Sequence, residues 1–150
     1  MKNLMLIVLA LFIIGGCDDD DNGANSKVTE IQTTVTSNQW IVTYFVDNDS
    51  YESDKFTGYV FEFGSDGIVR ATIGSTAVSG SWSVTSDDSG DDNSNGEFED
   101  IDFNISFSSP PDFEELSEDW QIISLTSTKI ELRHVSGGNG GTDLLTFENI

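Results

Sequence analysis

Cysteine, histidine and proline are nearly absent from this sequence of 150 residues, which holds one cysteine, one histidine and two prolines. A single cysteine cannot form a disulfide within the chain. A single histidine excludes a histidine-rich metal site and any catalytic arrangement of two histidines. Several common enzyme mechanisms are therefore ruled out before any motif is considered.

Positive charge is also scarce, because 6 lysines and arginines stand against 27 aspartates and glutamates, for a net charge of -21. Binding to nucleic acid or to an anionic bilayer needs clustered lysine and arginine, and the sequence has no such cluster. We therefore expect no nucleic-acid partner. The chain is 37% hydrophobic and 11% aromatic, which is enough for the core of one compact domain.

The start of the chain has the form of a secretory signal. Lys2 gives a short positive start, and an unbroken apolar run follows from Leu4 to Ile14. As a helix this run would span about 16 Å, roughly half of the ~30 Å hydrocarbon core of a bilayer, so it is too short for a transmembrane anchor. We expect residues 1–16 to be removed as a signal peptide.

The signal ends in Ile14, Gly15, Gly16 and Cys17, which resemble a bacterial lipobox. The resemblance implies a diacylglyceryl thioether on Cys17 and usually a third acyl chain on its amine. Two or three acyl chains hold a protein on a bilayer almost permanently. The alternative is an ordinary signal peptide that happens to end near a cysteine.

An acidic and polar stretch follows, with Asp18 to Asp21 and then Asn22 to Ser26, and it has no apolar side chain larger than alanine. This composition predicts a flexible tether over residues 17–27. An acidic run beside the lipidated cysteine resembles the export tag of surface-exposed lipoproteins in some bacteria with two membranes. In other lineages an aspartate there marks retention at the inner membrane. We predict an outer-membrane lipoprotein displayed at the cell surface, and a plain solvated spacer is the alternative.

Residues 28–150 form the predicted domain. Val28, Ile31 and Val35 lie three and four residues apart, which predicts a short helix within residues 27–37. Beyond it, apolar and polar residues alternate as in β-strands. The eight predicted strands are 39–46, 58–64, 68–73, 77–85, 98–107, 120–125, 129–135 and 143–148.

The connections favour hairpins. Asp66 and Gly67 tolerate the positive φ of a tight reversal, residues 74–76 and 126–128 are short enough to be reversals, and residues 137–141 form a longer one. Eight antiparallel strands in hairpin order, with no helical crossover, predict an all-β fold. The prediction is an eight-stranded up-and-down barrel.

Alternation also predicts which side chains share the buried face. Tyr59, Phe61 and Phe63 lie on it, as do alternate residues from 78 to 84 and from 101 to 107. On the first strand Trp40, Val42, Tyr44 and Val46 continue this face, although Ile41 and Phe45 leave the assignment ambiguous. Gly80 marks a bend.

Several segments resemble the lipocalin-like domains of bacterial lipoproteins. They are residues 40–44 (WIVTY), 58–63 (GYVFEF) with Asp66 and Gly67, 79–84 (SGSWSV), 116–120 (LSEDW), 129–133 (KIELR) and 144–148 (LLTFE). The resemblance covers about residues 37–150 and implies a lipocalin-like barrel. It carries over no assigned activity and no binding residues.

An eight-stranded barrel is either filled by side chains or just wide enough for one small ligand. Six inward aromatic residues are candidates for core or for pocket lining, namely Trp40, Tyr59, Phe61, Phe63, Trp82 and Phe103. A ligand among them would be apolar or amphipathic. We therefore expect a monomeric lipoprotein that binds a small molecule, and the alternative is an envelope interaction module with a filled core.

Residues 91–102 (DDNSNGEFEDID) fit the twelve-residue calcium-binding loop, with oxygen-bearing residues at positions 1, 3 and 5 and glycine at position 6. The loop ends in aspartate rather than glutamate and lacks flanking helices. A solvated acidic loop is the favoured alternative, and we expect no obligatory cofactor. The candidate ligands are Asp91, Asn93, Asn95, Glu97 and Asp102. A weaker second candidate is Asp47 to Ser50 with Glu52 and Asp54.

Catalysis would need a placed acid and base, and the nearest carboxylates are those of Glu114, Glu115, Glu118 and Asp119 after two prolines. With 27 acidic residues in the chain, such proximity is expected by chance, so we interpret them as a solvated helical turn. His134 shares a face with Ile130 and Leu132 and is expected to be a partly buried polar neighbour rather than a base. We therefore expect no enzymatic activity.

Overall fold

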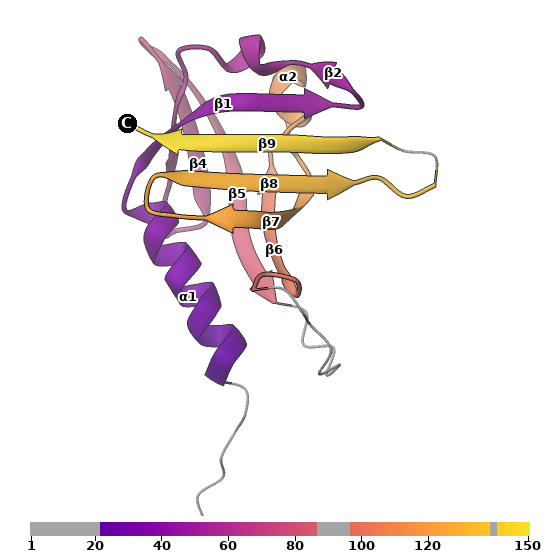
Figure 1. Ribbon diagram of the computed structural model, residues 1–150. Helices are drawn as coiled ribbons and strands as arrows, with labels where there is room; N and C mark the ends of the chain where they lie inside the picture. The colour runs from indigo at the N-terminus through magenta and orange to yellow at the C-terminus, as the bar shows by residue number, and fades with distance from the viewer. Residues whose placement is uncertain (1–21, 87–96, 139–140) are drawn as a thin grey trace, which may run out of the picture.

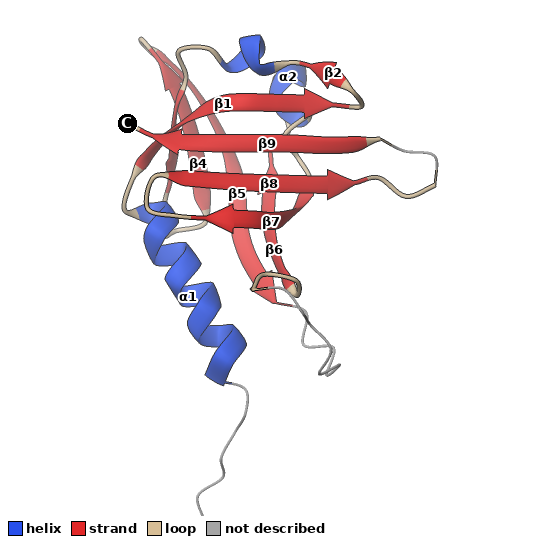
Figure 2. Ribbon diagram, in the orientation of Figure 1, coloured by secondary structure: helices blue, strands red, loops and turns tan. Residues whose placement is uncertain are grey.

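The computed structural model describes residues 22–86, 97–138 and 141–150. Strands curve into a barrel, and one long helix extends away from it (Figure 1; Figure 2). The helices are α1 (Asn22–Thr36), the 3-10 helix η1 (Ser53–Phe56) and α2 (Pro111–Glu114). The strands are β1 (Gln39–Asp47), β2 (Ser50–Tyr51), β3 (Val60–Phe63), β4 (Ile68–Ile73), β5 (Thr76–Ser86), β6 (Ile101–Ser106), β7 (Asp119–Leu125), β8 (Lys129–Val135) and β9 (Thr142–Asn149).

The strands follow one another around the barrel in chain order. Each strand from β3 to β8 pairs antiparallel with the next, and β1 pairs with β3 on one side and with β9 on the other. The two-residue strand β2 pairs antiparallel with the end of β1. Among the described residues, eight strands therefore close the sheet. The predicted all-β, eight-stranded up-and-down barrel is confirmed.

All eight predicted strands are present, and two of them are shorter than expected. β3 begins at Val60 rather than at residue 58, because Gly58 has a left-handed φ of 85° that interrupts the extended backbone. β6 begins at Ile101, because residues 97–100 form turns. Gly67 has a φ of 78°, as the predicted reversal at Asp66 and Gly67 requires.

The predicted helix is confirmed and is longer than expected. It begins at Asn22, so residues 22–27, which we predicted to be part of a flexible tether, are helical. Threonine side chains satisfy their hydroxyls within the helix, as when Thr33 Oγ1 donates to the carbonyl of Thr29 at 2.7 Å. Ile31 and Val35 are fully buried against the barrel, and this burial stabilises a helix that threonine propensity alone would disfavour.

The buried face of β1 changes partway along the strand. The pairing of β1 with β9 shifts register between Val42 and Tyr44. Beyond this bulge Phe45 is fully buried, whereas Tyr44 is 41% exposed. The prediction that Tyr44 and Val46 continue the inner face is therefore wrong, because a bulge reverses the alternation.

Each of the three tryptophans ties the barrel to a connecting segment. The indole N–H of Trp40 donates to the carbonyl of Val35 in α1 at 2.9 Å, and that of Trp82 donates to Gly64 after β3 at 2.8 Å. Trp120 donates to Leu116 beyond α2 at 3.0 Å. Every indole therefore combines core packing with a satisfied polar group, as buried tryptophan requires.

Gly80 lies close to the end of β6, and the bend predicted at this position stays a prediction. A methyl group added at this position would contact the Ser106 carbonyl oxygen and come within 2.7 Å of the Phe107 ring. The Phe107 ring therefore fills the space that a side chain at position 80 would occupy.

Candidate functional site

The six aromatic residues predicted to line the interior all lie in or against the core. Trp40, Phe61 and Phe103 have no exposed surface, and Phe63 and Trp82 are 3% and 7% exposed. Tyr59 is half-buried and packs against this cluster. All six thus belong to one hydrophobic core, within which Phe63, Trp82 and Phe103 are in mutual ring contact.

Phe63 is a centre of contact within the barrel. Its ring centroid lies 5.2 Å from that of Trp82, 5.6 Å from that of Phe103 and 5.6 Å from that of Phe147, each in edge-on geometry. Separations of this size are those of rings in direct contact. The rings therefore fill the interior around Phe63.

Both ends of the barrel are covered. At the end where β1 begins, α1 contributes Ile31 and Val35 to the core. At the opposite end, Phe56 of η1 and Phe113 of α2 are buried and lie edge-on at 5.3 Å. Sequence reasoning missed these two phenylalanines because they lie outside the strands, although Phe113 lies two residues after Pro111, the first residue of α2.

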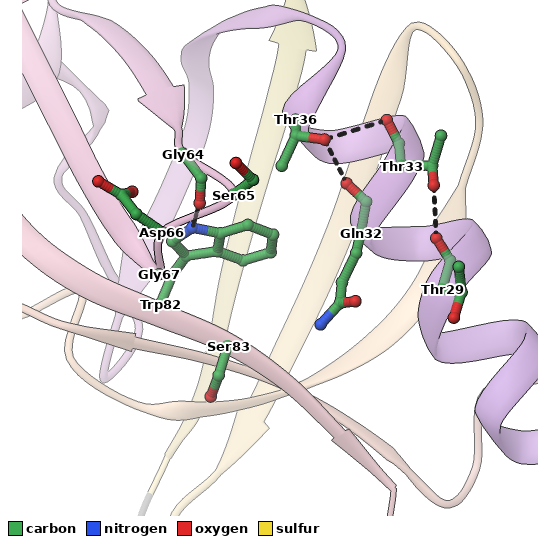
Figure 3. Close-up of a pocket in the computed structure, with 10 residues that line it drawn as sticks. All are labelled: Thr29, Gln32, Thr33, Thr36, Gly64, Ser65, Asp66, Gly67, Trp82 and Ser83. Carbon is green, nitrogen blue, oxygen red and sulfur yellow. Dashed lines mark hydrogen bonds between the residues drawn. The ribbon is translucent and has the colours of Figure 1, made fainter.

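A ligand-sized cleft lies outside the barrel, between α1 and the β3–β4 turn, and we call it the α1 cleft. Its volume is about 500 Å³. Figure 3 shows the indole of Trp82 at its centre, with Gln32 of α1 on one side and Asp66 of the turn on the other. Its lining residues are Thr29, Gln32, Thr33, Thr36, Gly64, Ser65, Asp66, Gly67, Trp82 and Ser83.

Most residues that line the α1 cleft have polar side chains, but the surface that they present to it is more apolar than polar. The Asp66 carboxylate accepts a hydrogen bond from the backbone N–H of Ile68 at 3.1 Å, which holds the turn. The Thr29 hydroxyl donates its hydrogen to the carbonyl of Asn25. Toward a ligand it can therefore act only as a hydrogen-bond acceptor. Of the six predicted aromatic residues, Trp82 lines this cleft and the other five do not. The binding role predicted for those five stays a prediction.

A second cleft of about 500 Å³ lies near the outer side of β7 and β8. Its floor includes Ile123, which is 51% exposed, and Arg133 donates to Gln121 beside it at 3.0 Å. The cleft also contains Glu97 and Phe98.

Only two of the predicted calcium ligands fall on described residues. Glu97 forms an ion pair with Lys27 of α1, and Asp102 lies on β6. Asp91, Asn93 and Asn95 lie outside the described residues. Calcium binding at residues 91–102 therefore stays a prediction, with the Glu97 carboxylate already engaged by an ammonium group.

The weaker acidic candidate near residue 47 is a turn between β1 and β2. Asn48 and Asp49 have left-handed φ values of 46° and 67°, and Glu52 pairs with Lys55 at 2.6 Å. Burial, and then the charge of Asp143, raises the pKa of Asp47. These carboxylates are thus held in turn and ion-pair contacts.

Two of the carboxylates considered as an acid–base alternative contact different partners. Glu115 bonds to Lys55 at 2.7 Å, whereas Glu118 lies 3.5 Å from His134. The Lys55 contacts with Glu115 and Glu52 raise its pKa well above the usual range and join α2 to η1. His134 is half-buried on the face of Ile130 and Leu132, as predicted.

The predicted signal peptide, the lipidation site Cys17 and the acidic run 18–21 lie outside the described residues. No helix among the described residues is long and apolar enough to cross a membrane.

No protein-family model matches this sequence, and no curated protein matches it. A search of solved structures finds similarity to the crystal structure of a DUF4847 family protein from Bacteroides vulgatus. The two share 16% sequence identity with a TM-score of 0.48, over 79% of this chain and 96% of the other.

Proposed function

We propose that this chain is a membrane-anchored lipoprotein of the bacterial cell envelope, whose barrel acts through its outer surface as a non-catalytic interaction module. The observation that carries the proposal is the packed interior around Phe63, together with the cover at both ends by α1 and by Phe56 and Phe113. A barrel that carries a ligand inside needs an open and enclosed cavity. This packing therefore favours a filled core over an internal ligand.

The anchor is the lipid proposed for Cys17. Only residues 18–21 separate this cysteine from α1, and α1 joins β1 through residues 37 and 38. Fifteen helical residues extend about 22 Å. Because α1 packs against the barrel from Val28 onward, we interpret only its first turn as a short link between the lipid anchor and the barrel.

The partner is expected to carry a basic surface. The net charge of -21 places the chain far from neutrality, and such a surface attracts cationic partners and repels anionic ones. We place the barrel on the outer face of the outer membrane, with residues 18–21 as the export tag. Deleting these four residues should leave lipidation intact but protect the protein from protease added to whole cells. Equal digestion of both versions would contradict the export role.

A second candidate function is small-ligand binding in the α1 cleft. The observation that favours it is a ligand-sized volume of about 500 Å³ with Trp82 at its centre and polar groups around it. A ligand there would be amphipathic, with its apolar part toward the indole and its polar part toward Gln32 and Asp66.

Titration with a neutral apolar fluorophore such as N-phenyl-1-naphthylamine separates these functions. The main proposal predicts no saturable binding to the purified protein. Saturable binding that Thr33→Trp abolishes would place a ligand in the α1 cleft and favour the second candidate. Saturable binding that survives Thr33→Trp but changes in Phe63→Ala would place the ligand inside the barrel and contradict both.

A further inference from the structure

Three side chains with metal-binding atoms meet at the end of the barrel opposite α1. His134 of β8 and Asp143 of β9 are direct partners in the antiparallel register, and Glu118 immediately precedes β7. His134 shares the inner face of its strand with the buried Ile130 and Leu132, and Asp143 shares that of Leu145. Two neighbouring strands and the residue before a third thus bring an imidazole and two carboxylates to one place on the barrel rim.

The ligand atoms are close enough for one ion. One nitrogen or oxygen from each of the three residues lies within 4.8 Å of the others, and His134 Nε2 lies 3.5 Å from Glu118 Oε2. Metal bonds of about 2.0–2.2 Å in tetrahedral geometry place neighbouring ligand atoms roughly 3.4 Å apart. Small side-chain rotations therefore suffice to bind an ion here.

Backbone groups beside the cluster hold the His134 and Asp143 side chains in place, as second-sphere contacts do around a metal. His134 Nδ1 lies 3.2 Å from the backbone carbonyl oxygen of Asp119, so the tautomer with hydrogen on Nδ1 donates there and leaves the Nε2 lone pair toward Glu118. Asp143 Oδ1 accepts from the backbone N–H of Asn48 at 2.8 Å. Such outer contacts fix the orientation of ligating imidazoles and carboxylates.

The charge at this place is unbalanced without a cation. Asp143 is only 4% exposed, and among the described ion pairs none joins it to a lysine or an arginine. Buried carboxylates are normally paired with a positive group or bound to a metal. Lys55, on η1, is occupied by Glu52 and Glu115.

We propose that Glu118, His134 and Asp143 bind a divalent transition-metal ion, zinc first among them. Imidazole nitrogen favours zinc over the hard cations calcium and magnesium, and three protein ligands with one open position suit zinc well. The His134 and Glu118 side chains are 22% and 39% exposed, so water can reach the open position. The site is independent of the proposed function, since it requires neither the lipid anchor nor either cleft.

Zinc titration of the full-length protein tests the site, using chelator-treated material purified without a polyhistidine tag. Calorimetry and metal analysis after dialysis should give one equivalent of zinc. His134→Gln, Glu118→Gln and Asp143→Asn should each weaken zinc binding by tenfold or more. Glu148→Gln is the matched control, because it removes an exposed carboxylate from β9 and should leave the affinity unchanged. Glu118 is partly exposed, so Glu118→Gln is expected to fold even if Asp143→Asn does not.

Two outcomes would overturn the proposal. One is the absence of retained zinc, and another is equal zinc affinity in the wild type and Glu118→Gln. Calcium is titrated in parallel, and calcium binding unaffected by the three substitutions would be assigned to another part of the chain.

Discussion

The hydroxyl of Ser53 takes the place of a neighbouring strand beside Phe45. Ser53 Oγ accepts from the backbone N–H of Phe45 at 2.6 Å and donates to the carbonyl of Phe45 at 3.3 Å. β3 pairs only with Gln39 and Trp40 at the start of β1, so the rest of this seam depends on η1 and β2. Ser117 makes the same two contacts with Phe107.

Ser53→Ala should therefore destabilise the barrel at its seam. Ser53 is 6% exposed, and leaving a buried N–H without a partner costs about 1–3 kcal/mol. Chemical denaturation followed by tryptophan fluorescence measures the free energy of unfolding. Ser81→Ala on the exposed face of β5 is the control, and an equal effect of both substitutions would show that the Ser53 hydroxyl has no special role.

Trp40→Phe should loosen α1. The substitution keeps an aromatic ring in the core but removes the donor to Val35, and the expected loss in free energy of unfolding is about 1–3 kcal/mol. Hydrogen exchange should show faster exchange in the last turn of α1. Trp120→Phe is the matched control, because its donor reaches Leu116 and should leave α1 protected. Unchanged exchange in α1 would contradict a stabilising role for the hydrogen bond from Trp40 to Val35.

Lys55→Met should weaken the contact between η1 and α2. Lys55 bonds to Glu52 and Glu115, and ion pairs that water still reaches contribute about 0.2–1 kcal/mol. Glu115, and then Glu52, raises the pKa of Lys55 above its usual 10.5. The stabilisation should be fully present below pH 10.5 and should disappear as the pH rises further. Urea titrations at pH 7 and pH 11 measure the difference in free energy of unfolding between the wild type and Lys55→Met. A difference that is larger at pH 11 than at pH 7 would contradict this prediction.

Cys17→Ser should abolish acylation and release the protein from the membrane fraction, because the lipid on Cys17 is the proposed anchor. Fractionation and mass measurement of the amino-terminal peptide test this. Retention of the variant in washed membranes would contradict the lipid anchor.

The strands of the barrel were predictable because each carries its own period-two pattern and a nearby turn signal. Ile68–Ile73 and Lys129–Val135 match the predicted ranges. The first strand was harder, because a bulge after Val42 moves Phe45 inward and no local residue type signals it. Register shifts depend on pairing with a distant strand, here β9, and single-strand periodicity does not carry that information.

The candidate sites were less predictable than the strands for a related reason. The α1 cleft joins Thr29 to Trp82, and the rim cluster joins Glu118 to Asp143. The residues of each pair lie far apart in the sequence and meet only when the barrel closes. The sequence predicted that His134 faces the same side as Leu132, but it offered no motif that would place two carboxylates beside it.

Native mass spectrometry of the protein purified from its own host in mild detergent tests the packed barrel most directly. The account predicts the mass of the acylated chain from Cys17 onward, with at most the added mass of a bound metal ion. A stoichiometric small apolar molecule that is released on unfolding, and whose retention depends on Phe63 rather than on Thr33, would contradict the filled core.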